Sequence, residues 1–304
     1  METIVVTSGE RWVDIDAVAC AIAYTELLNL LGRNATAVLP GLLNNSVTPF
    51  VRALGLSYET TCPPNPQSFV LVDISNSEFF AECVDLARVT EIFDHHSGFE
   101  AYWRERLGEK AQIEMIGACA TFIWEAYLRR GMANRISPCS AALLAIAIVS
   151  NTLNFNLPLT SERDLTAYQQ LLAHAQLPSD WLKNYSGEQD AASLADPAAV
   201  VLNDTKEERV PGLDRPLVIG QLELWDGKSF SKHHRNLAIA PLRNNSSPYW
   251  LLHTPSISEK RSYLITEHPQ VQALLKQRMG TIFHDNTAVL EPLVLRKMIL
   301  KSLQ

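Results

Sequence analysis

The chain has 304 residues, of which 47% are hydrophobic, and its formal net charge is −7. This length suits two domains with cores of their own, and the negative charge argues against a stable nucleic-acid complex. No apolar run approaches the roughly 20 residues that span a bilayer, and the N-terminus shows no signal-peptide pattern, so no membrane partner is expected. The five cysteines are scattered without a CxxC pair, which predicts free thiols and a cytoplasmic location.

Short apolar runs alternate with helical patterns in the first half of the chain. The first expected strand, Thr3–Thr7, ends at Ser8-Gly9, and a helix follows from about Ile15 to Leu31. Further strands are expected at 36–39, 69–72, 89–93 and 113–116, and helices at 47–54, 77–86, 118–130, 138–150 and 161–174. Strands that are apolar on both faces and alternate with helices indicate a parallel sheet that is covered on two sides.

A small, polar segment divides the chain into two predicted domains. Residues 186–197 form the expected linker, or a helix that crosses between a domain of residues 1–185 and one of residues 198–304. In the second part, strands are expected at 200–203, 217–224 and 250–253, and helices at 268–278 and 291–302. The predicted fold class is α/β: an N-terminal parallel-sheet domain, a smaller mixed α/β C-terminal domain, and an active site in the cleft between them.

Acidic residues follow three of the predicted strands. Asp14 and Asp16 come after the first, Asp73 follows the third, and Asp94-His95-His96 ends the fourth. A lone Asp at a strand end is most often a helix cap or turn residue, but functional groups of open parallel sheets also converge at this edge. Converging carboxylates repel one another unless a cation neutralises them, and carboxylates with imidazoles suit divalent manganese, cobalt, iron, zinc or magnesium. The pattern therefore predicts a divalent-metal site that has room for two ions and a bridging water.

These residues resemble the motifs of the DHH phosphoesterase superfamily. Residues 94–96 match its signature, and Gly9–Asp16 is similar to its first motif. Leu71-Val72-Asp73 resembles the second motif, and Gly117–Thr121 the small-residue turn that opens a helix. Ser150–Phe155 resembles a motif of the subgroup that holds family II inorganic pyrophosphatases, exopolyphosphatases and prune-like proteins.

The resemblance implies a metal-dependent phosphohydrolase that cleaves phosphoanhydride bonds in a small substrate, polyphosphate or pyrophosphate, with a metal-activated water. The metal ligands that it implies are Asp14, Asp16, Asp73 and His95, with Glu10 and Asn151 as further candidates. Two ions are expected, Mn²⁺ first and Mg²⁺ or Co²⁺ as alternatives. Asp94 would orient a histidine, and His96 would bind phosphate or act as an acid, which makes these two the catalytic candidates.

The second half carries the expected phosphate-binding residues. Asn203–Lys206 and the strand Val218–Glu223 resemble the D-x-K and I-x-Q-x-E elements that open the C-terminal domain of the same subgroup. The resemblance implies that Lys206 approaches the substrate phosphate. Further candidates for anion contacts are Lys260, Arg261 and Arg235. The glycine-rich element of the oligonucleotide-cleaving branch is absent from the sequence.

Three departures from the subgroup leave alternatives open. Glu10 stands where the pyrophosphatases have a histidine, and Asn151 where they have an aspartate. The nearest counterpart of their S-R-K-K motif, His284–Thr287, contains no Arg or Lys. One alternative is a prune-like binding or regulatory protein with weakened catalysis. Another is a phosphodiesterase that acts on short oligonucleotides or cyclic nucleotides, and a homodimer is also an open possibility.

Overall fold

The computed structural model describes residues 3–304 and contains two compact units. Unit 1 runs from Met1 to Leu182 and unit 2 from Lys183 to Gln304. The change of unit falls inside helix α7, Trp181–Ala195, so the predicted linker segment 186–197 is helical over most of its length. No helix within residues 3–304 is both long and apolar enough to cross a bilayer.

Unit 1 is built on a five-stranded sheet in which every neighbouring pair of strands is parallel. The strands, in their order across the sheet, are β3 (Ala35–Val38), β1 (Ile4–Thr7), β5 (Ser68–Val72), β6 (Val89–Asp94) and β7 (Ala111–Ile113). Strands β1 and β5 are buried along their whole length, as expected for strands covered on both faces. The predicted parallel sheet is confirmed.

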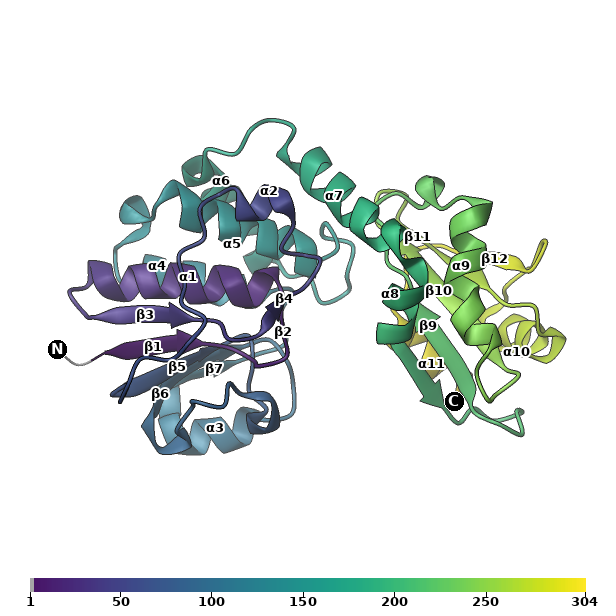
Figure 1. The fold of residues 1–304 in the computed structure, drawn as a ribbon, viewed down its shortest axis with the longest axis horizontal. Coiled ribbons are helices and arrows are strands. Elements are labelled where there is room, and N and C mark those ends of the chain that lie inside the picture. Colours follow the sequence, from purple (N-terminus) through teal and green to yellow (C-terminus); the bar gives the residue numbers. More distant parts are fainter. Residues whose placement is uncertain (1–2) are drawn as a thin grey trace. The chain divides into compact units, whose positions relative to one another are not determined.

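Helices cover both faces of this sheet (Figure 1). They are α1 (Ile15–Leu30), α2 (Pro49–Arg52), α3 (Glu100–Leu107), α4 (Cys119–Arg129), α5 (Pro138–Asn151) and α6 (Glu162–Ala175). Helix α1 packs against α4, α5 and β3, and it is apolar nearly all round because it is enclosed on several sides. Helix α3 packs against the sheet through Trp103, whose side chain is fully buried. Two short strands, β2 (Trp12–Val13) and β4 (Leu42–Leu43), form a separate parallel pair. In the chain, β2 lies just before α1, and β4 lies just after β3.

Unit 2 contains a five-stranded mixed sheet with helices on both faces. Its strands, across the sheet, are β12 (Thr287–Leu290), β11 (Arg261–Ile265), β10 (Trp250–Ser256), β9 (Leu217–Gln221) and β8 (Thr205–Glu208). One hydrophobic core contains residues of α8 (Pro197–Asn203) and α9 (Lys232–Arg243), and the other contains residues of α10 (Pro269–Met279) and α11 (Arg296–Leu303). Only β9 and β10 are parallel neighbours. The predicted fold class, α/β with a smaller mixed domain, is confirmed.

Two of the predicted elements are wrong. The strand expected at 200–203 belongs to α8, because Pro197 occupies the first turn and the Asp196 carboxylate accepts a hydrogen bond from the Ala199 N–H at 3.0 Å. The helix expected at 77–86 is replaced by two short 3₁₀ turns, η1 (Ser77–Phe79) and η2 (Leu86–Arg88). Long-range backbone bonds to the loop after β1 hold this segment in an irregular path.

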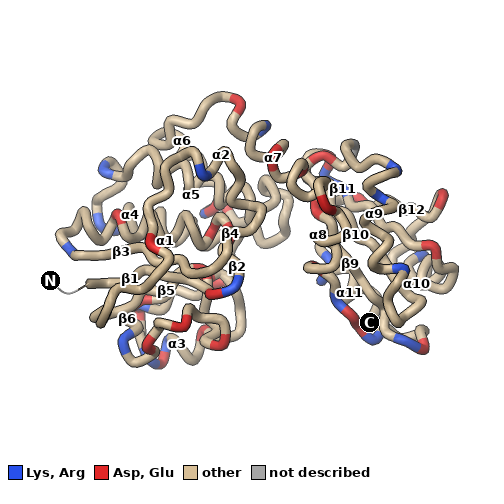
Figure 2. Tube along the Cα trace, viewed as in Figure 1, with Lys and Arg blue, Asp and Glu red and all other residues tan. Residues whose placement is uncertain are grey.

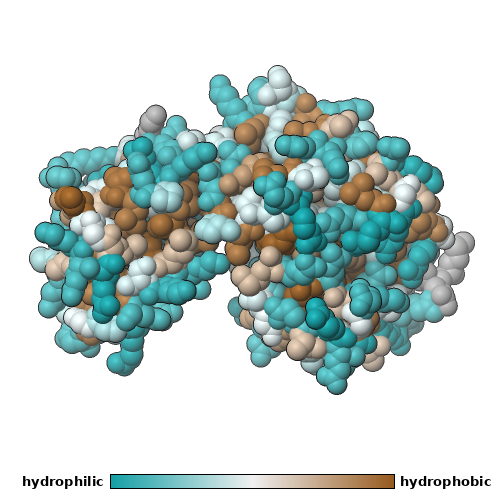
Figure 3. Space-filling view, turned by 180° about the vertical axis from the view of Figure 1, so that it is seen from behind, coloured by the Kyte–Doolittle hydropathy of each residue, from teal (hydrophilic) through white to brown (hydrophobic). Residues whose placement is uncertain are grey.

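Charged and apolar side chains are dispersed over the surface. The Lys and Arg positions of unit 2 are spread along its strands and helix ends (Figure 2). On the face shown in Figure 3, apolar residues are interrupted by hydrophilic ones. Charge alone therefore does not mark a binding surface.

Candidate metal centre

Three of the predicted metal ligands, Asp16, Asp73 and His95, lie together at the carboxyl edge of the parallel sheet of unit 1. Asp94 is the last residue of β6, with His95 directly after it, and Asp73 directly follows β5. The backbone N–H of Asp73 donates to the Phe93 carbonyl at 2.8 Å, so the two strand ends stay in register up to the site. Asp73 has a left-handed φ of 58°, a conformation that Asp and Asn tolerate better than most residues.

Asp73, His95 and His96 form a group with the spacing of metal ligands. One candidate ligand atom from each lies within 4.8 Å of the others, and this is the one such group found within residues 3–304. The Nε2 atom of His95 lies 3.4 Å from Oδ1 of Asp73, and Nδ1 of His96 lies 4.0 Å from the same oxygen. A carboxylate with two imidazoles is a donor set that suits divalent transition metals.

The tautomer of His95 follows from its backbone contact. Its Nδ1 atom lies 3.1 Å from the carbonyl oxygen of Ile116, which can only accept a hydrogen, so Nδ1 carries the proton in the neutral ring. The Nε2 lone pair is then directed toward Asp73 and toward Oδ2 of Asp16, 3.9 Å away. A lone pair that faces two carboxylates requires a cation or a proton between them.

Asp16 is anchored by the start of α4. Its two carboxylate oxygens accept hydrogen bonds from the backbone N–H groups of Cys119 and Ala120, at 2.8 and 2.9 Å. The residue is fully buried, and burial raises its pKa while the nearby His95 and these backbone bonds lower it. The helix N-terminus thus orients this carboxylate and partly compensates its charge.

Asp73 carries an unsatisfied charge. Its Oδ1 atom is buried and has no hydrogen-bond partner. Burial raises its pKa well above the ordinary value, and the carboxylates of Asp14 and Asp16 raise it further. An orphaned buried oxygen beside two more carboxylates is unfavourable in the protein alone, and a divalent cation would satisfy it. The residues present therefore fit a metal ion.

His96 is oriented by Asp94. Oδ1 of Asp94, a fully buried residue, accepts hydrogen bonds from the ring Nδ1 of His96 at 2.8 Å and from its backbone N–H at 3.1 Å. The side chain of His96 is 64% exposed, and the hydrogen bond to Asp94 raises its pKa. The ring is therefore held at one nitrogen and accessible to solvent elsewhere.

The other predicted ligands lie outside the group of three. Asp14 caps α1 by accepting a hydrogen bond from the Ala17 N–H at 2.9 Å. Glu10 is exposed, and its backbone N–H donates to the Phe79 carbonyl. Asn151 ends α5, and its side-chain amide donates to the Ala147 carbonyl at 3.4 Å. Roles of Glu10 and Asn151 at a metal remain predictions.

Asp164 is a supporting residue that sequence reasoning missed. This fully buried carboxylate accepts hydrogen bonds from the Gly117 N–H at 3.1 Å and from the Thr121 hydroxyl at 2.6 Å. A Cβ atom at Gly117 would lie 2.6 Å from Thr152 and 2.7 Å from Asp164, so only glycine fits the turn. The capping box that Ser161 and Asp164 form at the start of α6 was the available sequence signal.

The basic candidates of unit 2 lie on several elements. Lys206 is exposed on β8, and Lys260 is exposed in the turn before β11. Arg261 forms an ion pair with Glu291 at 3.0 Å, which occupies part of its charge. Arg235, near the start of α9, donates to the Thr287 hydroxyl at 3.1 Å, while its buried Nε has no hydrogen-bond partner.

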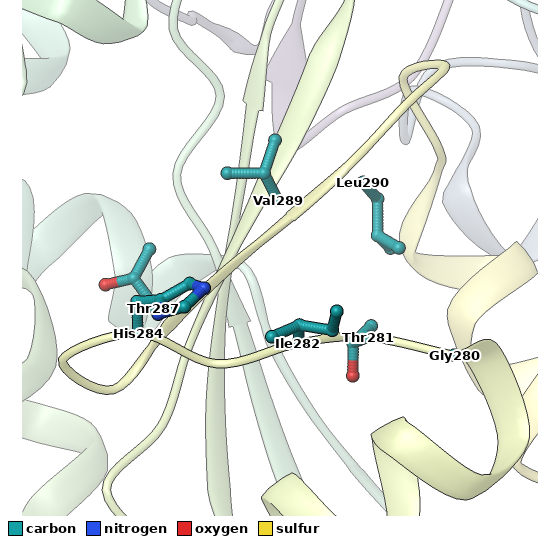
Figure 4. A pocket seen from close by; sticks show the side chains of 7 residues that line it. All are labelled: Gly280, Thr281, Ile282, His284, Thr287, Val289 and Leu290. Atoms are coloured by element: carbon teal, nitrogen blue, oxygen red, sulfur yellow. The ribbon is translucent and has the colours of Figure 1, made fainter.

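Arg235 reaches the segment where the sequence lacks a basic residue. His284–Thr287 forms a tight turn closed by two backbone hydrogen bonds of 2.8 and 2.9 Å, with Asp285 and Asn286 in the left-handed region. His284 and Thr287 line one end of a pocket of about 430 Å³, and the apolar side chains of Val289 and Leu290 line the rest together with residues 280–282 (Figure 4). The tertiary structure thus places an arginine at a turn that has none of its own.

The fold and the site define a two-unit α/β protein with an acidic, histidine-containing candidate metal site. The chain is 30% identical over 185 residues to a probable manganese-dependent inorganic pyrophosphatase of Bacillus cereus, a stretch of 58% of this chain and 57% of that protein. A protein of the same description from Bacillus thuringiensis matches equally. The match therefore spans less than two thirds of these relatives. No family model matches the chain.

Two solved structures share the fold over 99% of the chain. One is a putative family II inorganic pyrophosphatase of Methanococcus jannaschii, with a TM-score of 0.63, 20% identity and 99% of that chain covered. The other is an exopolyphosphatase-related protein of Bacteroides fragilis, with a TM-score of 0.54, 13% identity and 90% covered. The resemblance predicted from the motifs is supported: the chain is similar over 185 residues to manganese-dependent inorganic pyrophosphatases, and it shares the fold of a putative family II inorganic pyrophosphatase and of an exopolyphosphatase-related protein.

Proposed function

We propose that the protein is a divalent-metal-dependent hydrolase of phosphoanhydride bonds, with pyrophosphate or polyphosphate as substrate. The observation that carries the proposal is the buried, unpartnered Oδ1 of Asp73, which faces the Nε2 of His95. The names of the similar proteins, a manganese-dependent pyrophosphatase and an exopolyphosphatase-related protein, support the reaction class.

Mn²⁺ is the proposed ion, with Mg²⁺ and Co²⁺ as alternatives, and two ions are proposed. Asp14, Asp16, Asp73 and His95 would hold them. When bound, the metal supplies a Lewis acid that lowers the pKa of a coordinated water. The name of the Bacillus relatives supports manganese, and the mixed carboxylate and imidazole donors agree with it.

The protein's own residues would position the substrate and move protons. Asp94 holds Nδ1 of His96, so the other ring nitrogen can donate to a phosphate oxygen or to the leaving group. The hydrogen bond to Asp94 raises the pKa of His96, which favours the protonated form of the ring. In unit 2, Lys206 and Arg235, with Lys260 and Arg261 as further candidates, would bind the substrate phosphates. Arginine suits this role because its planar group can make two parallel hydrogen bonds to a phosphate.

Phosphate release from pyrophosphate and polyphosphate, measured with Mn²⁺, Mg²⁺, Co²⁺ and EDTA, tests the proposal. We expect release with at least one metal and none in EDTA. Asp73→Asn should abolish most of it, because the amide keeps the left-handed backbone but removes the charge. Asp85→Asn, at an exposed carboxylate that caps η2 in the same unit, is the matched control. No release from any phosphoanhydride with any metal would refute the hydrolase.

The second candidate is a prune-like binding or regulatory protein with weakened catalysis. It is favoured by the turn His284–Thr287, which offers no Arg or Lys of its own. Calorimetry with Mn²⁺ and pyrophosphate separates the two, since a binding protein would retain the ligand without releasing phosphate. Turnover of cyclic nucleotides or short oligonucleotides in the same assay would instead support the phosphodiesterase alternative.

The proposal also includes a cytoplasmic location and a homodimer. The five cysteines of the sequence are free in the structure, as expected for a reducing compartment. Sedimentation of the purified chain at several concentrations would establish its oligomeric state. We expect no stable complex with nucleic acid, in keeping with the net charge of −7.

A further inference from the structure

Two large apolar side chains are exposed next to each other on the short strands β2 and β4. Trp12 is 64% exposed and Leu42 is 67% exposed, and the two residues are direct neighbours in the register of this strand pair. Neighbouring residues of paired strands point to the same face, whereas Val13 points to the opposite face and is fully buried. Exposed hydrophobic side chains are ordinary when they are scattered, but these two adjoin and form one apolar surface. We call them the Trp12–Leu42 platform.

The backbone holds the platform in one orientation. The Leu42 N–H donates to the Arg11 carbonyl at 3.2 Å, which joins β4 to β2. A Cβ atom at Gly41 would lie 2.6 Å from the Glu10 carbonyl oxygen, so the two segments are in close contact and only glycine fits between them. A ligand that binds to Trp12 therefore meets a surface whose backbone is already fixed, which lowers the entropy cost of binding.

Trp12 lies on the chain segment that carries candidate metal ligands. Strands β2 and β4 follow β1 and β3 at the carboxyl edge of the sheet, where the candidate metal site lies (Figure 1). The backbone of Asp14 is extended, with φ −92° and ψ −178°, so residues 12 and 14 point to the same side and their Cα atoms are about 7 Å apart. Asp16 follows in the first turn of α1, and its Oδ2 atom lies 3.9 Å from Nε2 of His95. A small molecule can therefore contact Trp12 and reach these residues at the same time.

The size of the platform suits a planar ring rather than another protein. A stable protein interface buries about 1,200–2,000 Å² in total. The residues that precede Trp12, Glu10 and Arg11, are exposed and charged, so the apolar surface does not continue along the chain in that direction. An exposed tryptophan binds a flat heterocycle by stacking, and every nucleic-acid base offers such a face. The base of a nucleotide is therefore the occupant that fits.

We propose that the Trp12–Leu42 platform binds the base of a nucleoside 5′-polyphosphate, so that the phosphoanhydride bond that is cleaved belongs to a nucleotide. This inference rests on the hydrolase function proposed above and names its substrate class. Trp12 stacks on the base, Leu42 contacts its edge, and the phosphate chain extends toward Asp14 and Asp16. Water adds to the terminal phosphorus and the bond from that phosphorus to the bridging oxygen breaks. The products are orthophosphate, the nucleotide shortened by one phosphate, and a proton. Because stacking tolerates every base, Trp12 selects the class of substrate rather than the identity of the base.

Binding of AMP tests the platform without turnover, because AMP has no phosphoanhydride bond. Ribose 5-phosphate, which has the same sugar and phosphate but no base, is the matched ligand. In calorimetry, AMP should bind the wild type about 10-fold more tightly than ribose 5-phosphate does. Trp12→Ala should remove this difference, and Trp12→Phe should retain most of it. Tyr102→Ala, at a 43% exposed aromatic residue of α3, should leave the affinity for AMP unchanged. Equal affinities of the wild type for the two ligands would overturn the proposal.

Tryptophan fluorescence gives a second measurement of the same binding. The other five tryptophans are buried or half-buried, so a stacked base should quench mainly the emission of Trp12. AMP should quench the wild type with saturation, whereas ribose 5-phosphate should not. Quenching by AMP that persists in Trp12→Ala would place the base elsewhere and contradict the proposal.

ATP and inorganic tripolyphosphate, which have phosphate chains of the same length, relate the platform to turnover. With Mn²⁺, Trp12→Ala should lower the ratio of kcat/KM for ATP to kcat/KM for tripolyphosphate by about 10-fold, mainly through KM. A wild type that hydrolyses tripolyphosphate but not ATP would refute the nucleotide substrate and leave the hydrolase intact. AMP binding through Trp12 without turnover of any phosphoanhydride would refute the hydrolase and support the base-binding site. A Trp12→Ala chain with unaltered AMP binding but altered sedimentation would instead assign the platform to a contact between copies of the chain.

Discussion

The two units have similar layers but place their polar groups differently. Each has a five-stranded sheet between helices, but the sheet of unit 1 is wholly parallel whereas that of unit 2 contains one parallel pair. In unit 1 the carboxyl ends of β5 and β6 lie side by side, so Asp73 and His95 meet although they are far apart in sequence. In unit 2 the candidates Lys206, Arg235 and Arg261 lie on separate elements.

This difference between the two sheets shows how strand direction decides whether functional side chains lie close together. A parallel sheet brings every carboxyl end to one edge, where the loops that follow can share a ligand. An antiparallel neighbour reverses this direction. The basic candidates of unit 2 therefore lie on separate elements, and Arg235 contacts Thr287 of β12 only through its long side chain. We therefore expect substitutions in unit 1 to act on metal-dependent chemistry and those in unit 2 to act on substrate affinity.

The largest effect is expected from Asp73→Asn in unit 1. Metal-dependent phosphate release should fall by about 100-fold, because the variant lacks the charge of a proposed metal ligand beside His95. The metal-free variant should unfold at no lower temperature than the wild type, since the substitution removes an unpartnered buried charge. Measured together, activity and melting temperature distinguish a ligand from a structural residue. A variant that loses both would have lost its fold rather than its metal.

The turn that supports unit 1 provides the next largest effect. Gly117→Ala should lower the free energy of unfolding by about 2 kcal/mol, because the added Cβ would meet Thr152 and Asp164 at under 3 Å. Gly187→Ala in α7 is the matched control, with no atom within 4 Å of its added Cβ. The control should stabilise its helix slightly, as alanine favours helix more than glycine. Urea denaturation measures both, and equal effects would show that the turn has spare room.

Arg235→Ala tests unit 2. We expect KM for pyrophosphate to rise about 10-fold while kcat changes less, because a charged hydrogen bond to substrate phosphate is lost. Arg278→Ala, at an exposed arginine near the end of α10, should leave both constants unchanged. A fall in kcat with no change in KM would assign Arg235 to the reaction itself and remove the contrast between the units.

The smallest expected effect is a pH dependence of metal-free stability. The folded-state pKa values of Asp16 and Asp73 are raised by burial, so the folded chain binds their protons more tightly than the unfolded chain. Their contribution is fully present below the ordinary value of 3.8 and is lost as the pH rises through the folded-state values. The hydrogen bond to Asp94 also raises the pKa of His96 in the folded chain, so the contribution of His96 to stability is likewise lost as the pH rises, at higher pH than for the carboxylates.

Thermal unfolding in EDTA from acid to neutral pH measures this effect, with Asp73→Asn as the reference for all other titrating groups. The difference between the wild type and this variant should grow as the pH rises, and saturating Mn²⁺ should abolish the growth. A difference that stays constant with pH would show that Asp73 titrates normally.

The sequence by itself determined the parallel sheet of unit 1 and the residues at its carboxyl edge. Buried strands such as Phe69–Val72 are apolar on both faces. An Asp or an Asp-His-His sequence that follows such a strand must lie at the carboxyl edge of the sheet, because the strands are parallel. Local signals sufficed here because strand, turn and site are contiguous in the chain. The mixed sheet of unit 2 was predicted less completely, since β8, β11 and β12 have exposed or alternating residues.

Only the tertiary structure decided which groups meet across long separations. The contact of Asp164 with Gly117 and the reach of Arg235 to Thr287 depend on packing between elements that no local pattern encodes. The unpartnered oxygen of Asp73 is of the same kind, because burial and the absence of a donor are properties of the surroundings. The motifs predicted the candidate ligands, and the fold showed that Asp73 is buried beside other carboxylates with an oxygen that has no hydrogen-bond partner.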